Sequence, residues 1–324
     1  MPHAIRFHRT GGPEVLVWEE VEVGDPGPGE ARVRHRAVGL NYVDTYIRSG
    51  LYPASVPSGL GTEAAGIVEA VGPGVTDVKV GDRVAYSGGP LGAYADERVM
   101  PADRLVVVPD GITFEQAAAM MLKGMTVQYL IRQIHRVGPD DTILFHAAAG
   151  GVGSIACQWA KSLGATVIGT VGSDAKAELA RERGCDYPVV YTRENFVDRV
   201  REITGGAMLP VVYDSIGKDT FTSSLDCLRP RGLMVSFGQS SGAIGPVDLG
   251  ILAQKGSLFL TRPTLRNYAD TRSELVAMAQ DLFDVVQSGA VRIEINQTYP
   301  LRDAIRAHED LHARKTTGST VFTV

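Results

Sequence analysis

A glycine-rich turn between an apolar strand and a helix constrains the fold of this chain more than any other feature. Residues 142–146 read as a buried strand, and residues 154–163 carry apolar side chains at helical spacing. Between them, Ala148, Gly150 and Gly153 stand at the three small positions of a dinucleotide-binding fingerprint. Small residues are needed there because the turn is tight, the backbone approaches a diphosphate, and the helix packs closely on the strand. The pattern predicts a cofactor site at the helix N-terminus.

Further apolar strands and helical segments alternate after this turn, over residues 125–264. The expected strands are near-continuous apolar runs, which indicates burial on both faces, as in a parallel sheet covered by helices. They lie at 166–171, 189–191, 211–214, 233–237 and 258–260. We therefore expect an α/β fold with a Rossmann doubly wound parallel sheet.

The end of the second strand predicts which nicotinamide cofactor is bound. NAD enzymes place an acidic residue there for the ribose 2′-hydroxyl, but Gly172 and Ser173 occupy this position. Lys176 follows within one helical turn, and its ammonium group would attract a 2′-phosphate. Asp174 is expected to cap the following helix instead of binding the cofactor. The prediction is NADPH.

The first part of the chain, residues 1–124, has the pattern of a β domain. Glycine and proline punctuate short runs of period two, such as 31–37, which predicts a barrel-like arrangement of strands. A helix is expected to start at Thr113, whose side chain can form a capping box with Gln116. The tail, residues 265–324, predicts helices near 273–287 and 301–312 and a closing strand at 318–322.

Composition excludes several classes of protein. The 324 residues carry a net charge of −5 and no basic run, which argues against nucleic acid as the main ligand. No apolar stretch is long enough to span a membrane, and the N-terminus lacks a signal-peptide pattern. The three cysteines have no metal-ligand spacing, so we expect buried, reduced thiols and a cytoplasmic location.

Five motifs together resemble a known family. The segments 41–52, 61–66, 80–84, 148–153 and 213–217 are similar to those of the quinone oxidoreductases, zinc-free members of the medium-chain dehydrogenase/reductase superfamily that include the zeta-crystallins. The resemblance covers essentially the whole chain. It implies a GroES-like β-barrel catalytic domain (1–124), a Rossmann NADP-binding domain (125–264) and a C-terminal return to the catalytic domain (265–324). It also implies a homodimer joined through the edges of the Rossmann sheets.

The resemblance also implies a set of cofactor contacts beyond the glycine loop and the strand end. Asn41, Tyr42 and Tyr46 are similar to residues that face the nicotinamide, and Gly151 and Val152 to residues at the diphosphate. The other positions carried over from the family are Tyr129, Gly150, Gly153, Gly172, Ser173, Lys176, Tyr191, Ser215, Phe237, Gly238, Ser240, Thr264 and Arg314.

Zinc relatives carry a cysteine where Asn41 stands and a histidine where Thr62 stands, and Glu63 alone cannot hold a catalytic zinc. We therefore expect no metal and hydride transfer to a small electrophile such as a quinone, which needs little Lewis-acid assistance. Asn41, Tyr46 and Tyr52 are the catalytic candidates, although the tyrosines fit simple aromatic packing as well. His146 is expected to be structural.

Two other functions remain open from the sequence. One is an NADPH-dependent enal, enone or enoyl-thioester reductase, because these substrates also accept a hydride by conjugate addition. The other is an RNA-binding or structural role, as for some zeta-crystallin relatives.

Overall fold

The computed structural model describes residues 1–324, which divide into two compact units. The first unit comprises Met1–Met125, Ala269–Gln287 and Ile293–Val324, and the second comprises Thr126–Tyr268 and Ser288–Arg292. The chain therefore leaves the first unit for the second and returns near its C-terminus.

The first unit is mainly β. Its core sheet has seven strands in the order β15-β16-β3-β5-β6-β8, with β7 also paired to β3, and a smaller sheet has the order β2-β1-β4. The strands are β1 (His3–Phe7), β2 (Leu16–Glu20), β3 (Glu30–Leu40), β4 (Ser58–Gly59), β5 (Glu63–Val71), β6 (Arg83–Ser87), β7 (Glu97–Pro101), β8 (Val106–Val107), β15 (Ile295–Pro300) and β16 (Ser319–Thr323).

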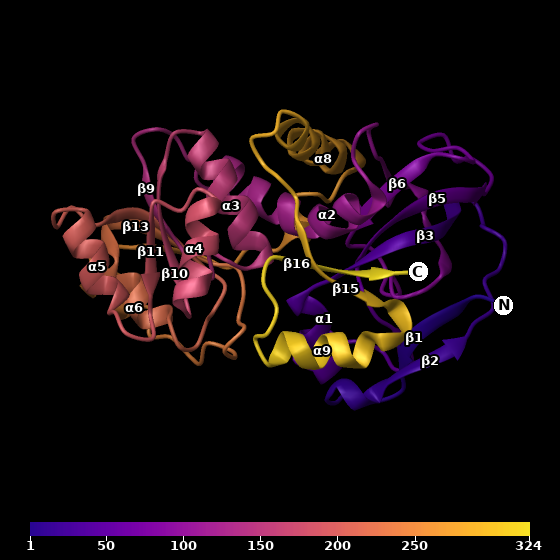
Figure 1. Cartoon of the computed structure of the whole chain (residues 1–324), viewed down its shortest axis with the longest axis horizontal. Coiled ribbons are helices and arrows are strands. Elements are labelled where there is room, and N and C mark those ends of the chain that lie inside the picture. Colours follow the sequence, from indigo (N-terminus) through magenta and orange to yellow (C-terminus); the bar gives the residue numbers. More distant parts are fainter. The chain divides into compact units, whose positions relative to one another are not determined.

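The long strand β3 organises this unit, because it pairs antiparallel with β5, β7 and β16. In Figure 1 the yellow C-terminal strands lie beside the indigo β3, so the C-terminal tail completes a sheet that starts with residues 30–40. Alternate residues of β3 enter a core that includes Phe7, Tyr86, Tyr94 and Phe322. The helices of this unit are α1 (Tyr42–Ser49), the start of α2 (Phe114–Gln128), α8 (Arg272–Gln287) and α9 (Ala304–His312).

The capping box predicted at Thr113 is present. The Gln116 N–H donates to the Thr113 hydroxyl oxygen at 3.1 Å, and the Thr113 N–H donates to the Gln116 side-chain oxygen at 3.0 Å. These bonds satisfy two of the amide groups that a helix start leaves without partners. A π-helical segment, Tyr129–Ile134, then follows α2 into the second unit.

The second unit is a six-stranded parallel sheet in the order β11-β10-β9-β12-β13-β14. The strands are β9 (Thr142–Phe145), β10 (Thr166–Val171), β11 (Tyr187–Val190), β12 (Leu209–Asp214), β13 (Leu228–Ser236) and β14 (Phe259–Thr261). The helices are α3 (Gly151–Ser162), α4 (Asp174–Glu182), α5 (Phe196–Ile203), α6 (Phe221–Asp226) and α7 (Gly250–Gln254).

This strand order reverses between β9 and β12, which is the switch point where doubly wound sheets bind ligands. Right-handed crossovers place α3 and α4 on one face and α5, α6 and α7 on the other. Buried residues such as Leu144, Ile168, Val212 and Met234 fill the core of the unit. The predicted fold class, a GroES-like β domain with a Rossmann sheet, is confirmed.

The remaining single-turn segments are 3₁₀-helices at Pro13–Val15, Ala102–Arg104, Leu265–Asn267 and Leu301–Asp303. All three cysteines are free and buried, as expected. None of the helices combines the length and the apolar character that a membrane crossing requires.

Candidate functional site

The glycine loop lies at the switch point and opens α3. Gly150 is the N-cap residue, in an extended conformation, and no side chain caps the helix. One backbone hydrogen bond closes the loop on itself, from the Gly150 N–H to the Ala147 carbonyl at 2.8 Å. Another ties the loop to β10, from the Ala148 N–H to the Thr170 carbonyl at 3.0 Å. The amide groups of the first helical turn have no intrahelical acceptors, so this end of α3 suits an anion.

Gly153 is required by the close packing of the helix on the loop. A Cβ at this position would lie 2.3 Å from the Ala147 carbonyl oxygen and 2.7 Å from the Ala148 Cα. Both atoms belong to the backbone and cannot move aside without opening the turn. The third small position of the fingerprint thus has the physical cause expected from the sequence.

The tip of β10 holds the residues expected at a 2′-phosphate. A Cβ on Gly172 would lie 3.0 Å from the Tyr191 hydroxyl oxygen, so this glycine leaves room for the tyrosine, whose side chain is half exposed. Ser173 is the N-cap residue of α4, and its hydroxyl oxygen accepts the Lys176 N–H at 3.4 Å. Gly172, Ser173, Lys176 and Tyr191 are therefore neighbours.

The expectation that Asp174 caps this helix is wrong, because Ser173 performs that role. The Asp174 carboxylate instead pairs with the Arg193 guanidinium. The hydrogen bond from Arg193 lowers the pKa of Asp174. Arg193 was missed in the sequence, where nothing marks its proximity to a residue 19 positions earlier.

The tips of β12 and β13 lie against each other beside the glycine loop. The Ser240 N–H donates to the Ser215 carbonyl at 3.1 Å, and a Cβ on Gly238 would lie 2.6 Å from that same oxygen. The Phe237 ring packs on the Phe145 ring with centroids 5.5 Å apart. The structure thus brings together four of the predicted residues, Ser215 after β12 and Phe237, Gly238 and Ser240 after β13.

The remaining predicted residues of the second unit occupy its connecting segments. Thr264 precedes the 3₁₀-helix Leu265–Asn267. The Tyr129 ring is buried and stacks on Tyr268, with centroids 4.6 Å apart and planes 10° from parallel. This stacking fixes the start of the π-helical segment.

His146 is structural, in agreement with the sequence interpretation. Its ring is buried, with Nδ1 2.9 Å from the Thr170 hydroxyl and Nε2 2.9 Å from the Ser224 hydroxyl. Ser224 in turn donates to the Asp214 carboxylate at 2.7 Å, and burial lowers the pKa of His146. The network joins β10, β12 and α6 below the glycine loop, but the fully buried Ser224 is inaccessible as a nucleophile.

In the first unit, three tyrosines form a row along α1 and the following loop. The Tyr42 and Tyr46 rings have centroids 6.3 Å apart, and the Tyr46 and Tyr52 rings meet edge to face at 5.3 Å. The Tyr52 N–H also donates to the Tyr46 carbonyl at 3.0 Å. The tyrosines therefore do pack on one another, while each ring keeps part of its surface exposed. Arg314 lies exposed after α9, in a left-handed conformation.

Asn41 precedes α1 and contacts a buried ion pair. Its Nδ2 donates to Glu63 Oε2 at 2.7 Å, and Lys123 Nζ lies 3.4 Å from the same oxygen. The other Glu63 oxygen accepts the Leu122 N–H at 2.7 Å. Glu63 is fully buried and Lys123 is 6 % exposed. Close by, a Cβ on Gly39 would lie 2.3 Å from Glu63 Oε2, so only glycine leaves room for this carboxylate.

A second buried polar chain starts at Asp44 in the first turn of α1. Its Oδ2 accepts the Asn41 N–H at 2.9 Å and the Tyr94 hydroxyl at 2.9 Å. Tyr94 lies 3.2 Å from Nε2 of His308, whose Nδ1 lies 3.1 Å from Arg48. Arg48 is a donor only, so the His308 proton is on Nε2 and points to Tyr94. Burial raises the pKa of Asp44 to about 7 and lowers the pKa of His308 to about 3.

The partners of Asn41 were missed in the sequence, although one signal was present. Lys123 is the single charge in the apolar helical stretch 117–128, which indicates a buried lysine with a partner. Glu63 had been considered only as an isolated zinc ligand. Its oxygens are instead engaged by two side chains and a backbone amide, and Asn41 and Thr62 lack the donor atoms of zinc sites. These residues do not fit a zinc ion.

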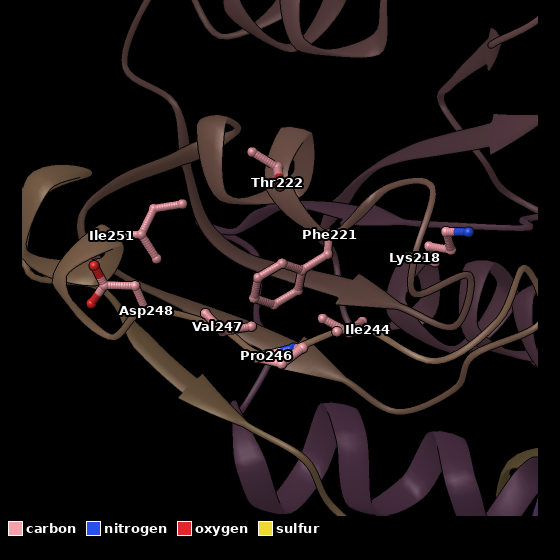
Figure 2. A pocket seen from close by; sticks show the side chains of 9 residues that line it. Lys218, Phe221, Thr222, Ile244, Pro246, Val247, Asp248 and Ile251 are labelled. Carbon is pink, nitrogen blue, oxygen red and sulfur yellow. The ribbon is translucent and has the colours of Figure 1, made fainter.

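A hollow in the second unit lies apart from the predicted cofactor residues. It has a volume of about 280 Å³ and is lined by residues of α6 and the 244–251 segment. Figure 2 shows Phe221, Ile244 and Val247 between Lys218 and Asp248, which lie on opposite sides of the view. None of the residues expected at the cofactor contributes to it.

Comparisons with known proteins agree with this architecture. Residues 27–110 match the alcohol dehydrogenase GroES-like domain, and residues 151–280 match the family described as zinc-binding dehydrogenase. The chain is 60% identical over 323 residues to a quinone oxidoreductase of Pseudomonas aeruginosa, covering 99% of each protein. It is 50% identical over 332 residues to a 2-haloacrylate reductase of a Burkholderia species, again covering 99% of each.

Among solved structures, the quinone oxidoreductase of Escherichia coli complexed with NADPH superposes with a TM-score of 0.98. That protein is 54% identical, and the match covers 99% of this chain and all of the other. A GroES-like unit interrupted by a Rossmann unit, with a glycine loop at the switch point, defines the dehydrogenase/reductase class. Within that class, the chain belongs to the quinone oxidoreductase family of the medium-chain dehydrogenase/reductase superfamily.

Proposed function

We propose that this protein is an NADPH:quinone oxidoreductase that works without zinc. The observation that carries the proposal is the uncapped N-terminus of α3 at the switch point, beside a β10 tip that presents Gly172 and Ser173 instead of an acid. The family supports the same function, since two relatives named quinone oxidoreductase are 60% and 54% identical to this chain.

Bound NADPH supplies the hydride, and this chain binds and orients the reactants. The amide groups of Gly151, Val152 and Gly153 would receive the diphosphate, with Gly150 keeping the backbone close. The Lys176 ammonium would neutralise the 2′-phosphate. The further residues that we assign to cofactor binding are Asn41, Tyr42, Tyr46, Tyr129, Gly172, Ser173, Tyr191, Ser215, Phe237, Gly238, Ser240, Thr264 and Arg314.

On the substrate side, we assign Asn41, Tyr46 and Tyr52 to the quinone. The two tyrosine rings contact each other and offer flat apolar surface together with phenol donors. A quinone that accepts a hydride becomes a phenolate with a low proton affinity, so a hydrogen bond from a phenol or an amide suffices to stabilise it.

A second function is favoured by one relative. The 2-haloacrylate reductase at 50% identity acts, by its name, on a conjugated acid, and conjugate addition of hydride needs the same cofactor geometry. Reduction of enals or enones is therefore the alternative activity.

The experiment that tests both is a substrate panel read by NADPH oxidation. We expect turnover of 1,4-benzoquinone and 9,10-phenanthrenequinone to exceed turnover of a 2-enal and of 2-chloroacrylate. Faster reduction of the unsaturated acid or aldehyde would show that conjugate reduction, and not quinone reduction, is the main activity.

We also propose a homodimer formed through the edge of the Rossmann sheet. Strand β14 pairs with β13 on one side only, so its other edge offers unpaired backbone groups. Phe259 on this strand is 61 % exposed and Leu249 is 71 % exposed, which suits burial against a second copy. The cytoplasmic location stays a prediction, supported by the three free thiols.

A further inference from the structure

The ion pair between Glu63 and Lys123 lies beside Asn41 and has no role in the function proposed above. Both side chains are buried within the first unit, at the start of β5 and in the second half of α2. A buried ion pair is a poor source of stability, because removing two charges from water offsets most of their attraction. Its position next to a candidate catalytic residue therefore suggests a more specific role.

The atom of Asn41 that faces Glu63 is identified by chemistry. An ionised carboxylate only accepts hydrogen bonds, so the group 2.7 Å from Glu63 Oε2 is the amide nitrogen and not the oxygen. The Asn41 backbone N–H donates to the Asp44 carboxylate at 2.9 Å, which fixes the residue at the start of α1. The contact with Glu63 sets the orientation of the carboxamide, and one N–H of Nδ2 is left over to donate to another group.

We infer that Glu63 and Lys123 are positioning residues that hold the Asn41 carboxamide so that its second N–H can donate to a carbonyl oxygen of a bound ligand. This inference rests on the proposed function, which supplies two such oxygens, one on the quinone and one on the nicotinamide carboxamide. Lys123 Nζ contacts the same Glu63 oxygen that accepts from Asn41, and so holds the carboxylate in place.

The surroundings of Glu63 contain few other charges that could replace Lys123. Asp44 and the Tyr94 hydroxyl interact electrostatically with Glu63 from α1 and the β6–β7 connection, and both interactions disfavour added negative charge. Lys123 is the cation in contact with this carboxylate. Its loss would leave the buried Glu63 carboxylate without this contact, among acidic and phenolic neighbours.

The test compares Glu63→Gln and Lys123→Met with Lys123→Arg and the double variant Glu63→Gln/Lys123→Met. Glu69→Gln is the matched control, since Glu69 lies on the same strand and pairs with Arg34 at the surface. Each protein is measured for its melting temperature, for NADPH affinity by fluorescence titration, and for kcat and KM with 1,4-benzoquinone at one fixed pH.

For Glu63→Gln we expect NADPH affinity or kcat/KM to fall about tenfold. Asn41 and Leu122 donate to different Glu63 oxygens, and a side-chain amide has only one oxygen. Loss of NADPH affinity assigns the Asn41 donor to the nicotinamide, and loss confined to the quinone parameters assigns it to the substrate. For Lys123→Met we expect a loss in the same parameter that Glu63→Gln lowers, because the carboxylate is no longer fixed against Asn41. Lys123→Arg should restore that parameter, and the double variant should resemble Glu63→Gln.

A folded Lys123→Met protein with wild-type NADPH affinity and kcat/KM would overturn the inference, as would a Glu63→Gln protein that matches Glu69→Gln in affinity and rate. If Lys123→Met does not fold, the Glu63→Gln comparison decides alone. A wild-type protein without NADPH-dependent quinone reduction would instead contradict the proposed function, so the two failures are distinguishable.

Discussion

Arg193 pairs with Asp174 through two nitrogen–oxygen contacts, each 2.6 Å long, at the tip of β10. This carboxylate is the one acidic group in the 172–176 segment, where a 2′-phosphate would bind. Bidentate pairing with a guanidinium reduces the repulsion that the carboxylate would exert on a phosphate. A chain with an acid in this segment can therefore still select the phosphorylated cofactor.

The first prediction concerns this pair. Arg193→Gln should weaken NADPH binding about threefold and leave NADH binding nearly unchanged, since the exposed charge of Asp174 is no longer neutralised. Titration of both cofactors at low salt measures the effect. The double variant Arg193→Gln/Asp174→Asn should recover NADPH affinity, and failure to recover would show that Arg193 itself contacts the phosphate.

Lys176 gives a second prediction with a larger effect. Lys176→Glu should raise the KM for NADPH by about tenfold or more and change the KM for NADH far less, because attraction to the 2′-phosphate is replaced by repulsion. Steady-state kinetics with both cofactors provide the measurement. Lys79→Glu, an exposed lysine of the first unit, is the control for net charge. Equal losses for the two cofactors would contradict the assignment of Lys176.

The glycine loop predicts the effect of one added methyl group. Gly153→Ala should lower the free energy of unfolding by about 1–3 kcal/mol and abolish measurable NADPH binding, since the new Cβ collides with the Ala147 carbonyl. Thermal unfolding and calorimetry check the two effects. Gly138→Ala is the control in the same unit, because no atom lies within 4 Å of its added carbon. Normal cofactor binding by Gly153→Ala is the outcome that would refute the packing argument.

Asp44 predicts a pH dependence of stability. Its pKa is 3.8 when unperturbed and about 7 when buried in the folded protein. Protons bind the folded state more tightly, so the stabilisation is present below pH 4 and is lost as the pH rises to about 7. Asp44→Asn should remove this loss, which is on the order of a few kcal/mol.

Denaturant unfolding at several pH values measures this difference between the two proteins. His35 and His308, whose pKa values are lowered to about 4 and about 3, act in the opposite direction below pH 6.5. They are common to both proteins and cancel in the comparison. Parallel stability curves for wild type and Asp44→Asn between pH 4 and 7 would rule out the titration of Asp44.

The sheet edge predicts a change of oligomeric state. Phe259→Lys should convert a dimer into a monomer, because a charge on β14 opposes both strand pairing and apolar burial. Sedimentation or light scattering measures the mass, and Val107→Lys, which replaces an exposed apolar residue on strand β8 of the first unit, is the control. A dimer that persists in the Phe259→Lys protein would place the interface elsewhere.

Local pattern by itself determined the alternation of strands and helices, the glycine loop and the missing acid at Gly172 and Ser173. These features depend on residues close together in the chain, where apolar periodicity and the need for small side chains are directly visible. The capping box at Thr113 and the structural role of His146 also follow from local sequence, and both are observed.

Only the tertiary structure decided how the charged residues pair. Glu63 contacts Lys123, 60 residues later in the chain, and Asp174 pairs with Arg193, 19 residues later. Asp44 bonds to Tyr94, 50 residues later, and Tyr94 contacts His308 a further 214 residues along. The energy of a charge depends on its burial and on its nearest partner, and neither is encoded in local periodicity. For this reason the cofactor loop could be read from the sequence, while the network that orients Asn41 could not.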